Sequence, residues 1–149
     1  MPKITKYISV MLVDDDADDR KIFSKALSQV AEKASLTSFS NGKELIDFLN
    51  KEKHQESLPD ILFLDINMPV MNGIDVLHKL RTDLKISNLP IAIYSTSSHE
   101  NDILNALKEG ANIYITKPRS FDKLTEVIQK VLLSDFQDNS KLTLNTFVL

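Results

Sequence analysis

Acidic residues follow two of the most apolar stretches of the sequence. Asp14 and Asp15 come directly after Ile8–Val13, and Asp65 comes directly after Ile61–Leu64. Two carboxylates about 5 Å apart repel each other by roughly 3 kcal/mol at an effective dielectric of about 20, so converging carboxylates either take up protons or hold a cation. Mg²⁺ prefers oxygen ligands of this kind. The pattern therefore predicts a Mg²⁺ site if the two stretches end side by side.

Two further polar side chains stand at the ends of later apolar stretches. Ser95 ends the stretch 91–95, and Lys117 with Pro118 follows the stretch 112–116. A lysine beside the carboxylates could pair with Asp65 or with an anion on it, and a serine hydroxyl could donate a hydrogen bond. Taken singly, Lys117 could also be an ordinary surface lysine, although the functional reading is favoured, and Ser95 could be a strand-end serine without a role.

The formal charges of this group favour one kind of chemistry. Three carboxylates, one lysine and one Mg²⁺ balance to zero, and a phosphoryl group of charge about −2 on Asp65 leaves the group near −1. That charge is tolerable with the metal and prohibitive without it. The layout suits a reversible, metal-dependent phosphoryl acceptor with a carboxylate as nucleophile.

The chain alternates five times between a short apolar stretch and a longer stretch of helical periodicity, which predicts an α/β fold with five parallel strands and five helices. The expected strands are Ile8–Val13, Ser35–Phe39, Ile61–Leu64, Ile91–Ser95 and Asn112–Thr116. The first, third and fourth are continuous apolar runs, as central strands are, whereas the second and fifth mix polar and apolar residues. A doubly wound, flavodoxin-like sheet of order 2-1-3-4-5 satisfies this pattern and brings the two acidic strand ends together.

The helices show their ends and their buried faces. Asp16 with Asp19 three positions later predicts an N-cap, Asn41 with Glu44 predicts a capping box, and Gly110 predicts a helix end. Apolar residues recur at helical spacing in five groups: Ile22, Phe23, Ala26, Leu27 and Val30; Leu45, Ile46 and Leu49; Gly73, Leu77, Leu80 and Leu84; Ile103, Leu104 and Leu107; Leu124, Val127, Ile128 and Val131.

Length and composition limit the function classes. The 149 residues fit one domain, and a net charge of −3 argues against a nucleic-acid partner. With no cysteine, neither a disulfide nor a thiolate metal site can form, and His54, His78 and His99 lack the spacing of a zinc site. No apolar run approaches the roughly 20 residues that span a bilayer. We expect a cytoplasmic protein without a membrane partner.

The motifs LVDDD, FLDINMPVMNG, IAIYST and YITKP, in this order from about Ile8 to Leu133, resemble the receiver domain of bacterial response regulators, the CheY-like family. The resemblance implies that Mg²⁺ is the cofactor and that the Lys117–Pro118 peptide bond is cis. It also implies the site residues: Asp65 as phosphoacceptor, Asp14, Asp15, Asp65 and the backbone carbonyl of Asn67 as metal ligands, Ser95 and Tyr114 as switch residues, and Lys117 as the cation that binds the phosphoryl group.

The same resemblance implies partners. A histidine kinase or phosphotransfer protein would phosphorylate Asp65, and the fourth helix, fifth strand and fifth helix would then change their protein contacts, with a homodimer through that face expected. The DDDADDR opening resembles single-domain regulators paired with phytochrome-type or hybrid kinases. We expect one receiver domain over 1–149, with a core of about 8–134. The tail 135–149 is too short for a DNA-binding output domain; it is expected to be a docking arm or a disordered end, or to add as a strand to a partner.

Three other functions share parts of the pattern. An aspartyl-phosphate phosphatase carries its nucleophile on the first strand with a second Asp two positions later, whereas Asp65 ends the third strand and is followed at that position by Asn67. A receiver-like scaffold that is not phosphorylated usually lacks one of the acids or the lysine, and all are present here. A flavodoxin-type flavin module needs a phosphate loop where this chain has acids that would repel it.

Overall fold

A five-stranded parallel sheet forms the centre of the computed structural model, which describes residues 3–52, 58–134 and 148–149. The strands are β1 (Ile8–Val13), β2 (Ala34–Phe39), β3 (Ile61–Leu64), β4 (Ile91–Ser95) and β5 (Ile113–Thr116). Their order is β2-β1-β3-β4-β5, which confirms the doubly wound fold with the expected strand order.

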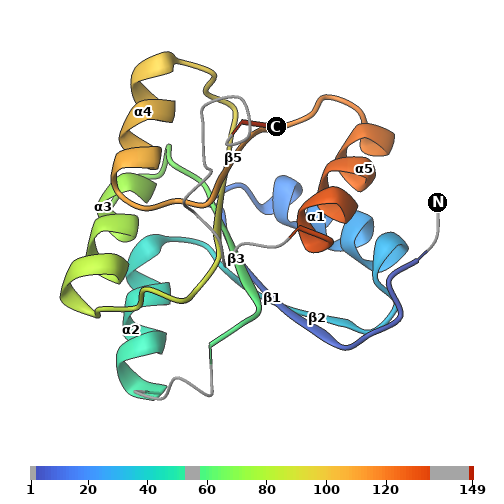
Figure 1. The fold of residues 1–149 in the computed structure, drawn as a ribbon, viewed down its shortest axis with the longest axis horizontal. Helices are drawn as coiled ribbons and strands as arrows, with labels where there is room; N and C mark the ends of the chain where they lie inside the picture. The colour runs from blue at the N-terminus through green and yellow to red at the C-terminus, as the bar shows by residue number, and fades with distance from the viewer. Residues whose placement is uncertain (1–2, 53–57, 135–147) are drawn as a thin grey trace.

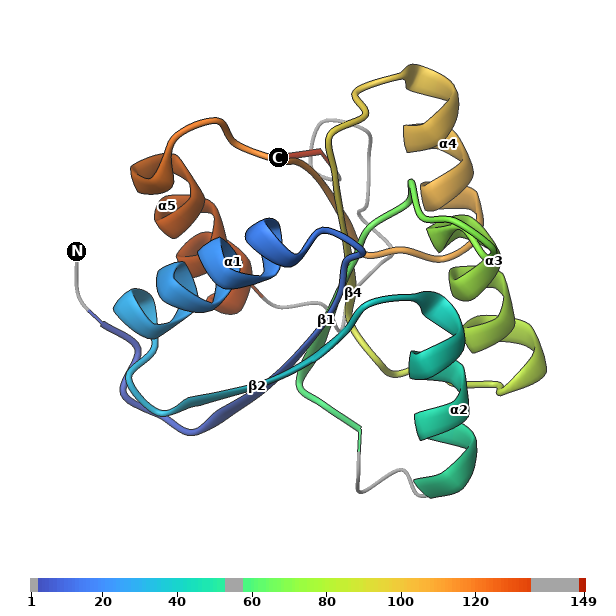
Figure 2. The ribbon, with the colours of Figure 1, turned by 180° about the vertical axis from the view of Figure 1, so that it is seen from behind.

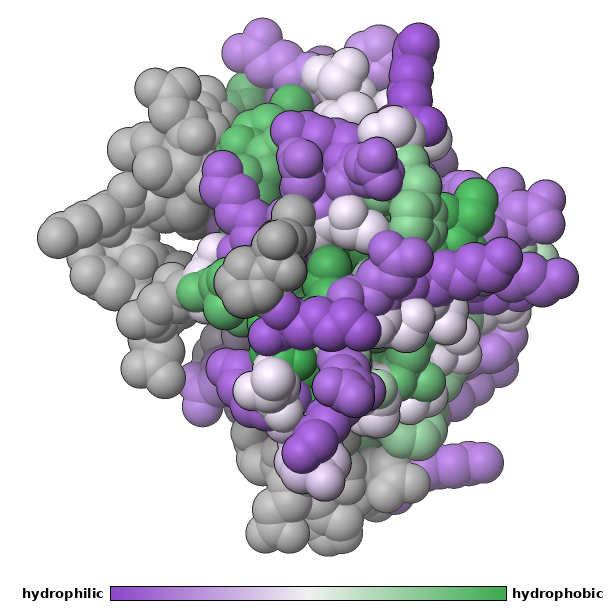
Figure 3. Space-filling view, turned by 90° about the vertical axis from the view of Figure 1, so that its right-hand side faces the viewer, coloured by the Kyte–Doolittle hydropathy of each residue, from purple (hydrophilic) through white to green (hydrophobic). Residues whose placement is uncertain are grey.

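Helices cover both faces of the sheet (Figures 1 and 2). One face carries α1 (Ala17–Val30) and α5 (Phe121–Leu132), and the other carries α2 (Gly42–Glu52), α3 (Gly73–His78) and α4 (Glu100–Lys108). After α3 the chain continues for one wider turn, η2 (Lys79–Asp83), a π-helix. The outer surface on the side of α1 and α5 is mostly hydrophilic (Figure 3), as expected for amphipathic helices whose apolar sides are used against the sheet.

The core consists of two hydrophobic clusters, one on each face. Alternate residues of β1 enter opposite clusters: Val10 and Leu12 pack towards α1 and α5, whereas Met11 and Val13 pack towards α2 and α3. This alternation is the two-residue period of a strand buried on both sides. The central strands therefore have no free face, and the positions for chemistry are at their ends.

Small departures from the predicted elements have local causes. β5 begins at Ile113 rather than Asn112, and at the preceding position the Asn112 side chain accepts a hydrogen bond from the Ile91 N–H (2.8 Å) at the start of β4. Ile22 and Leu104, which the helical spacing grouped with core residues, are 44% and 40% exposed. Both lie at the margin of an apolar stripe whose centre is filled by neighbouring residues of the same helix.

The end of the predicted docking arm lies against the sheet. β5 is an edge strand, and Val148 forms an isolated parallel bridge with its Tyr114, while the Leu149 N–H donates to the Tyr114 carbonyl (2.8 Å). Residues 135–147 of the arm are outside the described part of the chain, as is His54 in the loop after α2. The strand addition expected towards a partner is thus made here, over two residues, within the same chain.

Candidate functional site

The acidic residues meet at the carboxyl ends of β1 and β3. Val13 pairs with Leu64 across these adjacent strands, and the Asp65 N–H donates to the Val13 carbonyl (3.0 Å). As a result, carboxylate oxygens of Asp14, Asp15 and Asp65 lie within 4.8 Å of one another. Asp14 is fully buried and Asp65 is 5% exposed, whereas Asp15 is exposed. The predicted convergence of the three carboxylates is confirmed.

A tight loop after β3 fixes the Asp65 backbone. The Gly73 N–H donates to the Ile66 carbonyl (2.8 Å), and Asn72 caps α3 by accepting from the Asp75 N–H (2.9 Å). This brings the Gly73 α-carbon so close to β3 that a β-carbon on it would overlap the Asp65 carbonyl oxygen. The sequence showed Gly73 only as a helix residue, whereas the structure shows that the missing β-carbon is what permits this close approach.

Lys117 reaches into the acidic group from the end of β5. Its Nζ lies 2.8 Å from Asp14 Oδ2, 2.9 Å from Asp19 Oδ2 and 3.3 Å from Asp65 Oδ2, and its side chain is 9% exposed. The ammonium also lies 5.2 Å from the centre of the Tyr94 ring, a cation–π distance. The predicted contact with Asp65 is confirmed, whereas the contact with Asp19 was not predicted from the sequence.

The start of α1 holds Asp14 in place. Asp16 is the N-cap, as predicted, and its Oδ1 accepts from the N–H groups of Asp18 (2.9 Å) and Asp19 (3.1 Å). Asp14 Oδ1 accepts from the Asp16 N–H (3.0 Å), and Arg20 Nη1 donates to the Asp14 carbonyl (2.7 Å). This supporting role of Arg20 was not predicted from the sequence, because its side chain binds a backbone atom six positions away.

Burial sets the protonation behaviour of the group. Desolvation raises the pKa of Asp65 from 3.8 to about 6; the charge of Asp14 adds to this rise, and Lys117 opposes it. Desolvation also raises the pKa of Asp14, against the hydrogen bond from Lys117. Burial alone would lower the pKa of Lys117, but its hydrogen bonds to Asp14 and Asp19 outweigh this and raise the pKa. Lys117 therefore stays charged near neutral pH, whereas the Asp65 carboxylate takes up a proton as the pH falls through about 6.

A pH dependence of stability follows for the metal-free protein. Because the folded-state pKa of Asp65 lies above 3.8, its contribution is fully present below about pH 4 and is lost as the pH rises through about 6. At about 1.4 kcal/mol per pKa unit, the loss is as much as about 3 kcal/mol. We expect Asp65→Asn to have the same free energy of unfolding as the wild type near pH 4 and a higher one at pH 7. Urea denaturation of both proteins in chelator checks this, and a difference that does not vary with pH contradicts it.

The two expected switch residues are linked to each other. Ser95, fully buried at the end of β4, accepts through Oγ from the Ser97 N–H (3.1 Å), and the Tyr114 hydroxyl donates to the Ser97 carbonyl (2.7 Å). Tyr114 itself is completely buried. A movement of Ser95 can therefore reach Tyr114 through two bonds at one residue, Ser97.

The expectation of a cis Lys117–Pro118 bond is wrong for this structure. The described residues contain no cis peptide bond. Trans is the intrinsically favoured form even before proline, by about 0.5–1 kcal/mol. From the trans form, the Lys117 N–H donates to the Ser95 carbonyl (2.7 Å) while its side chain reaches the carboxylates.

Val70, in the loop beside Asp65, has an unfavourable backbone conformation. Its φ is 70° and it is 98% exposed, so no contact compensates for a β-branched residue in the left-handed region. We expect Val70→Asn to raise the free energy of unfolding by about 1 kcal/mol, since asparagine tolerates this region. Val70→Thr, which keeps the branch, should bring no gain. Equal stability of the two variants in urea denaturation contradicts the prediction.

The donor set fits a hard divalent cation. Among the described residues, the group of three carboxylates is the one cluster of potential metal ligands, and it contains no histidine. His78 instead pairs with Glu109 (2.8 Å). The Asn67 N–H donates to Asp65 Oδ1 (3.3 Å), which sets the Asn67 backbone beside the carboxylate. The acidic cluster can hold a metal ion through oxygen ligands.

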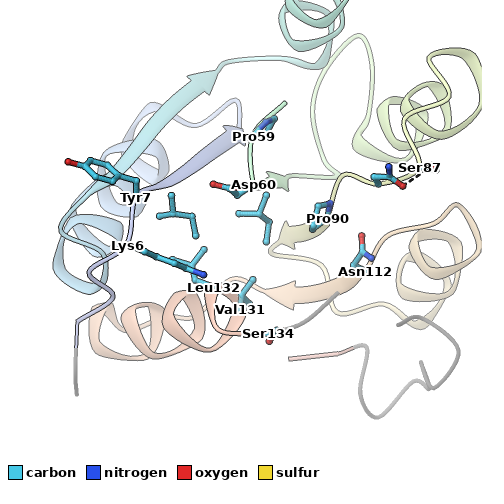
Figure 4. A pocket seen from close by; sticks show the side chains of 13 residues that line it. Lys6, Tyr7, Pro59, Asp60, Ser87, Pro90, Asn112, Val131, Leu132 and Ser134 are labelled. Atoms are coloured by element: carbon cyan, nitrogen blue, oxygen red, sulfur yellow. Dashed lines mark hydrogen bonds between the residues drawn. The ribbon is translucent and has the colours of Figure 1, made fainter. Parts of the chain in front are cut away.

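The cavity of about 840 Å³ drawn in Figure 4 lies elsewhere. Its walls come from the segments that precede β1, β3 and β4, such as Tyr7, Asp60 and Pro90, and from the end of α5 at Leu132. These are the amino ends of the strands, opposite to the acidic group. Asp60 is already used there, accepting from the Ser9 N–H (2.7 Å). The cavity is therefore not part of the candidate site.

Comparisons with known proteins agree with this geometry. A family model described as the response regulator receiver domain matches residues 10–129. The chain is 31% identical over 125 residues to the chemotaxis protein CheY homolog of Campylobacter jejuni, a match that covers 84% of this chain and 92% of that protein. It is also 31% identical over 121 residues to the sensor histidine kinase CheAY of Helicobacter pylori, covering 81% of this chain and 14% of that protein.

A solved structure shows the same likeness. The phosphorylated cyanobacterial phytochrome response regulator RcpA superimposes with a TM-score of 0.74 at 27% identity, over 85% of this chain and 91% of that chain. The chain belongs to the response regulator receiver domain family. Its receiver is of the CheY type, and its function is that of a response regulator in two-component signalling. No helix among the described residues is long and apolar enough to cross a membrane.

Proposed function

We propose that Asp65 accepts a phosphoryl group in the presence of Mg²⁺ and that the modification changes the protein contacts of the domain. The observation that carries this proposal is the convergence of Asp14, Asp15 and Asp65 with the Lys117 ammonium, from the ends of three strands. Asp14, Asp15, Asp65 and the Asn67 carbonyl would hold the metal. When bound, Mg²⁺ supplies positive charge that offsets the charge of the transferred group.

The chemistry uses residues of this chain on both sides of Asp65. A carboxylate oxygen of Asp65 attacks the phosphorus of a phosphohistidine, the P–N bond breaks, and the leaving imidazole nitrogen keeps the electron pair and takes a proton. The Lys117 ammonium pairs with one phosphoryl oxygen and the Ser95 hydroxyl donates to another. Asp65 has to be ionised to attack. Its raised pKa of about 6 still lies below neutral pH, so most of the carboxyl groups are ionised and reactive at pH 7.

The switch starts at Ser95. When its hydroxyl turns to the phosphoryl group, the bond from the Ser97 N–H is lost, and the Ser97 carbonyl that holds the Tyr114 hydroxyl is free to move. The local charge change thus biases two packings of the β4–α4 loop and Tyr114, which is a population shift. The contacts of α4, β5 and α5 change as a result.

The partners follow from the chemistry. Receiver domains of the CheY type take their phosphoryl group from histidine kinases, and the donor proposed here is such a kinase or a phosphotransfer protein. The likeness to RcpA, a phosphorylated regulator by its description, supports phosphorylation of this chain and a donor of the phytochrome type. The protein proposed here is a signalling phosphoacceptor rather than an enzyme with its own substrate. Its proposed location is the cytoplasm, as expected from the sequence.

A homodimer through α4, β5 and α5 is the proposed output state. Val148 and Leu149 cover the edge of β5 at Tyr114, so a partner at this edge has to displace them. We expect light scattering to detect a dimer with a phosphoryl mimic and more dimer when Val148→Asp weakens the cover. If the wild type and Val148→Asp are both monomeric with the phosphoryl mimic, the proposed homodimer is contradicted.

Beryllofluoride, which mimics an aspartyl-phosphate, provides the direct test. In ¹⁵N-labelled protein we expect amide shifts at Asp65, Ser95 and Lys117 with beryllofluoride and Mg²⁺ together, and none with beryllofluoride in chelator. Asp65→Asn should abolish them, whereas Asp60→Asn, a change of the same kind at the other end of β3, should not. Shifts that are independent of Mg²⁺, or that persist in Asp65→Asn, overturn the proposed function.

A further inference from the structure

Asp19 binds Lys117 but has no part in the expected site. Its Oδ2 lies 2.9 Å from Lys117 Nζ, as close as Asp14 at 2.8 Å and closer than Asp65 at 3.3 Å. The Asp19 backbone is held in place for this contact, because its N–H donates a hydrogen bond to Oδ1 of the N-cap residue Asp16 (3.1 Å). It joins residues 98 positions apart, at the N-terminus of α1 and the end of β5.

The three carboxylates that bind Lys117 are not equivalent. Asp14 and Asp65 belong to the cluster whose oxygens lie within 4.8 Å of each other and can hold a metal, and Asp19 does not. A metal and Lys117 therefore compete for Asp14 and Asp65, whereas Asp19 binds Lys117 and lies outside that cluster. When a divalent cation takes the shared carboxylates, it repels the ammonium, and Asp19 is the remaining anionic partner that Lys117 already contacts.

Asp19 also changes the charge of the site. Four carboxylates and one ammonium carry three formal negative charges, so one divalent cation still leaves the site negative. Because the Asp19 side chain is 33% exposed, solvent screens its direct charge effect, and Asp19 acts mainly through Lys117. It draws the ammonium away from the metal ligands, which favours the cation, and away from Asp65, which disfavours an anion there. The same residue thus acts in opposite directions on the two ligands of the site.

We propose that Asp19 is a positioning residue that retains Lys117 beside the acidic cluster when the metal binds and thereby sets the balance between metal affinity and affinity for the phosphoryl group. This inference rests on the proposed function of Asp65. Without Asp19, Lys117 remains on Asp14 and Asp65 in the metal-free protein, which weakens metal binding. Once the metal is bound, the ammonium is no longer held back and moves to the phosphoryl oxygens.

Asp19→Asn tests the proposal, with Asp18→Asn as the matched control. Asp18 is the preceding residue, is exposed, and loses the same charge. For Asp19→Asn we expect the Kd for Mg²⁺ to rise about fivefold and the Kd for beryllofluoride at saturating Mg²⁺ to fall about fivefold, the size of a weak coupling between sites. For Asp18→Asn both constants should change less than about twofold, because an exposed charge is screened. Both are measured by NMR titration in physiological salt.

Asp19→Asn and Asp18→Asn are also made in a Lys117→Met background. This background distinguishes an effect of Asp19 through Lys117 from a direct effect of its charge on the ligands. If Asp19 acts through Lys117, Asp19→Asn should change neither constant by more than about twofold once the lysine is gone. A fivefold effect that persists without Lys117 overturns the proposal. Independently of that variant, we expect the Lys117 ammonium NMR signal of the metal-free wild type to be lost or strongly shifted in Asp19→Asn and unchanged in Asp18→Asn.

The outcomes also distinguish this inference from the proposed function. If wild-type protein binds no beryllofluoride with Mg²⁺, the proposed function fails. If the wild type binds it and Asp19→Asn behaves like Asp18→Asn, only the role of Asp19 is refuted.

Discussion

In metal-free protein, Lys117→Met is expected to lower the free energy of unfolding at pH 7 by about 3 kcal/mol, the cost of leaving buried charges without their partner. The ammonium is the shared partner of Asp14, Asp19 and Asp65, and the first and last of these are buried. Mg²⁺ should restore most of the loss, because the divalent cation takes the place of the missing positive charge. Urea denaturation in chelator and in Mg²⁺ measures both effects.

Lys123→Met is the control for this experiment. Lys123 pairs with Glu126 at 3.5 Å on the surface, where its side chain is 63% exposed, so its loss should cost less than about 0.5 kcal/mol with or without Mg²⁺. If Lys117→Met costs no more than the control, or if Mg²⁺ brings no recovery, then Lys117 and the metal do not share the carboxylates.

Gly73→Ala is expected to damage both the fold and the site. The added β-carbon would meet the Asp65 carbonyl oxygen, a backbone atom at the end of a central strand that cannot turn away. We expect a loss of about 3 kcal/mol of stability, typical of severe overpacking. Beryllofluoride affinity should fall by about 100-fold, because a displacement of about 1 Å is enough to misalign a reacting group.

Gly42→Ala provides the comparison. A β-carbon at Gly42 would meet the Val76 side chain instead of the backbone, away from Asp65. This variant should lose stability but keep its affinity for beryllofluoride, as NMR titration would show. If both glycine variants bind the mimic equally well, the close approach at Gly73 does not position Asp65.

The sheet and the three acids could be predicted because they depend on periodicity and topology alone. Apolar runs identify the central strands, and parallel strands end at a common edge, so Asp14 and Asp65 had to meet. The bounds of β1, β3 and β4 followed in the same way. Patterns of this kind involve many residues, so single exceptions such as the exposed Ile22 do not disturb them.

The supporting contacts could not be predicted because each depends on a single distance. In the sequence, Asp19 is an acid in the first turn of a helix, where the helix dipole alone explains it. Its pairing with Lys117 needs the relative position of α1 and β5, and the overlap at Gly73 needs that of α3 and β3. The trans Lys117–Pro118 bond and the bridge of Val148 to Tyr114 are likewise set by tertiary contacts.

The most direct test of the central claim is to locate the phosphoryl group chemically. The protein is incubated with acetyl phosphate and Mg²⁺, the acyl phosphate is reduced with borohydride, and the resulting homoserine is mapped by peptide mass spectrometry. We predict homoserine at position 65 in the wild type with Mg²⁺, and none in chelator or in Asp65→Asn. Homoserine at another aspartate, or none at position 65 in the presence of Mg²⁺, would contradict the proposal.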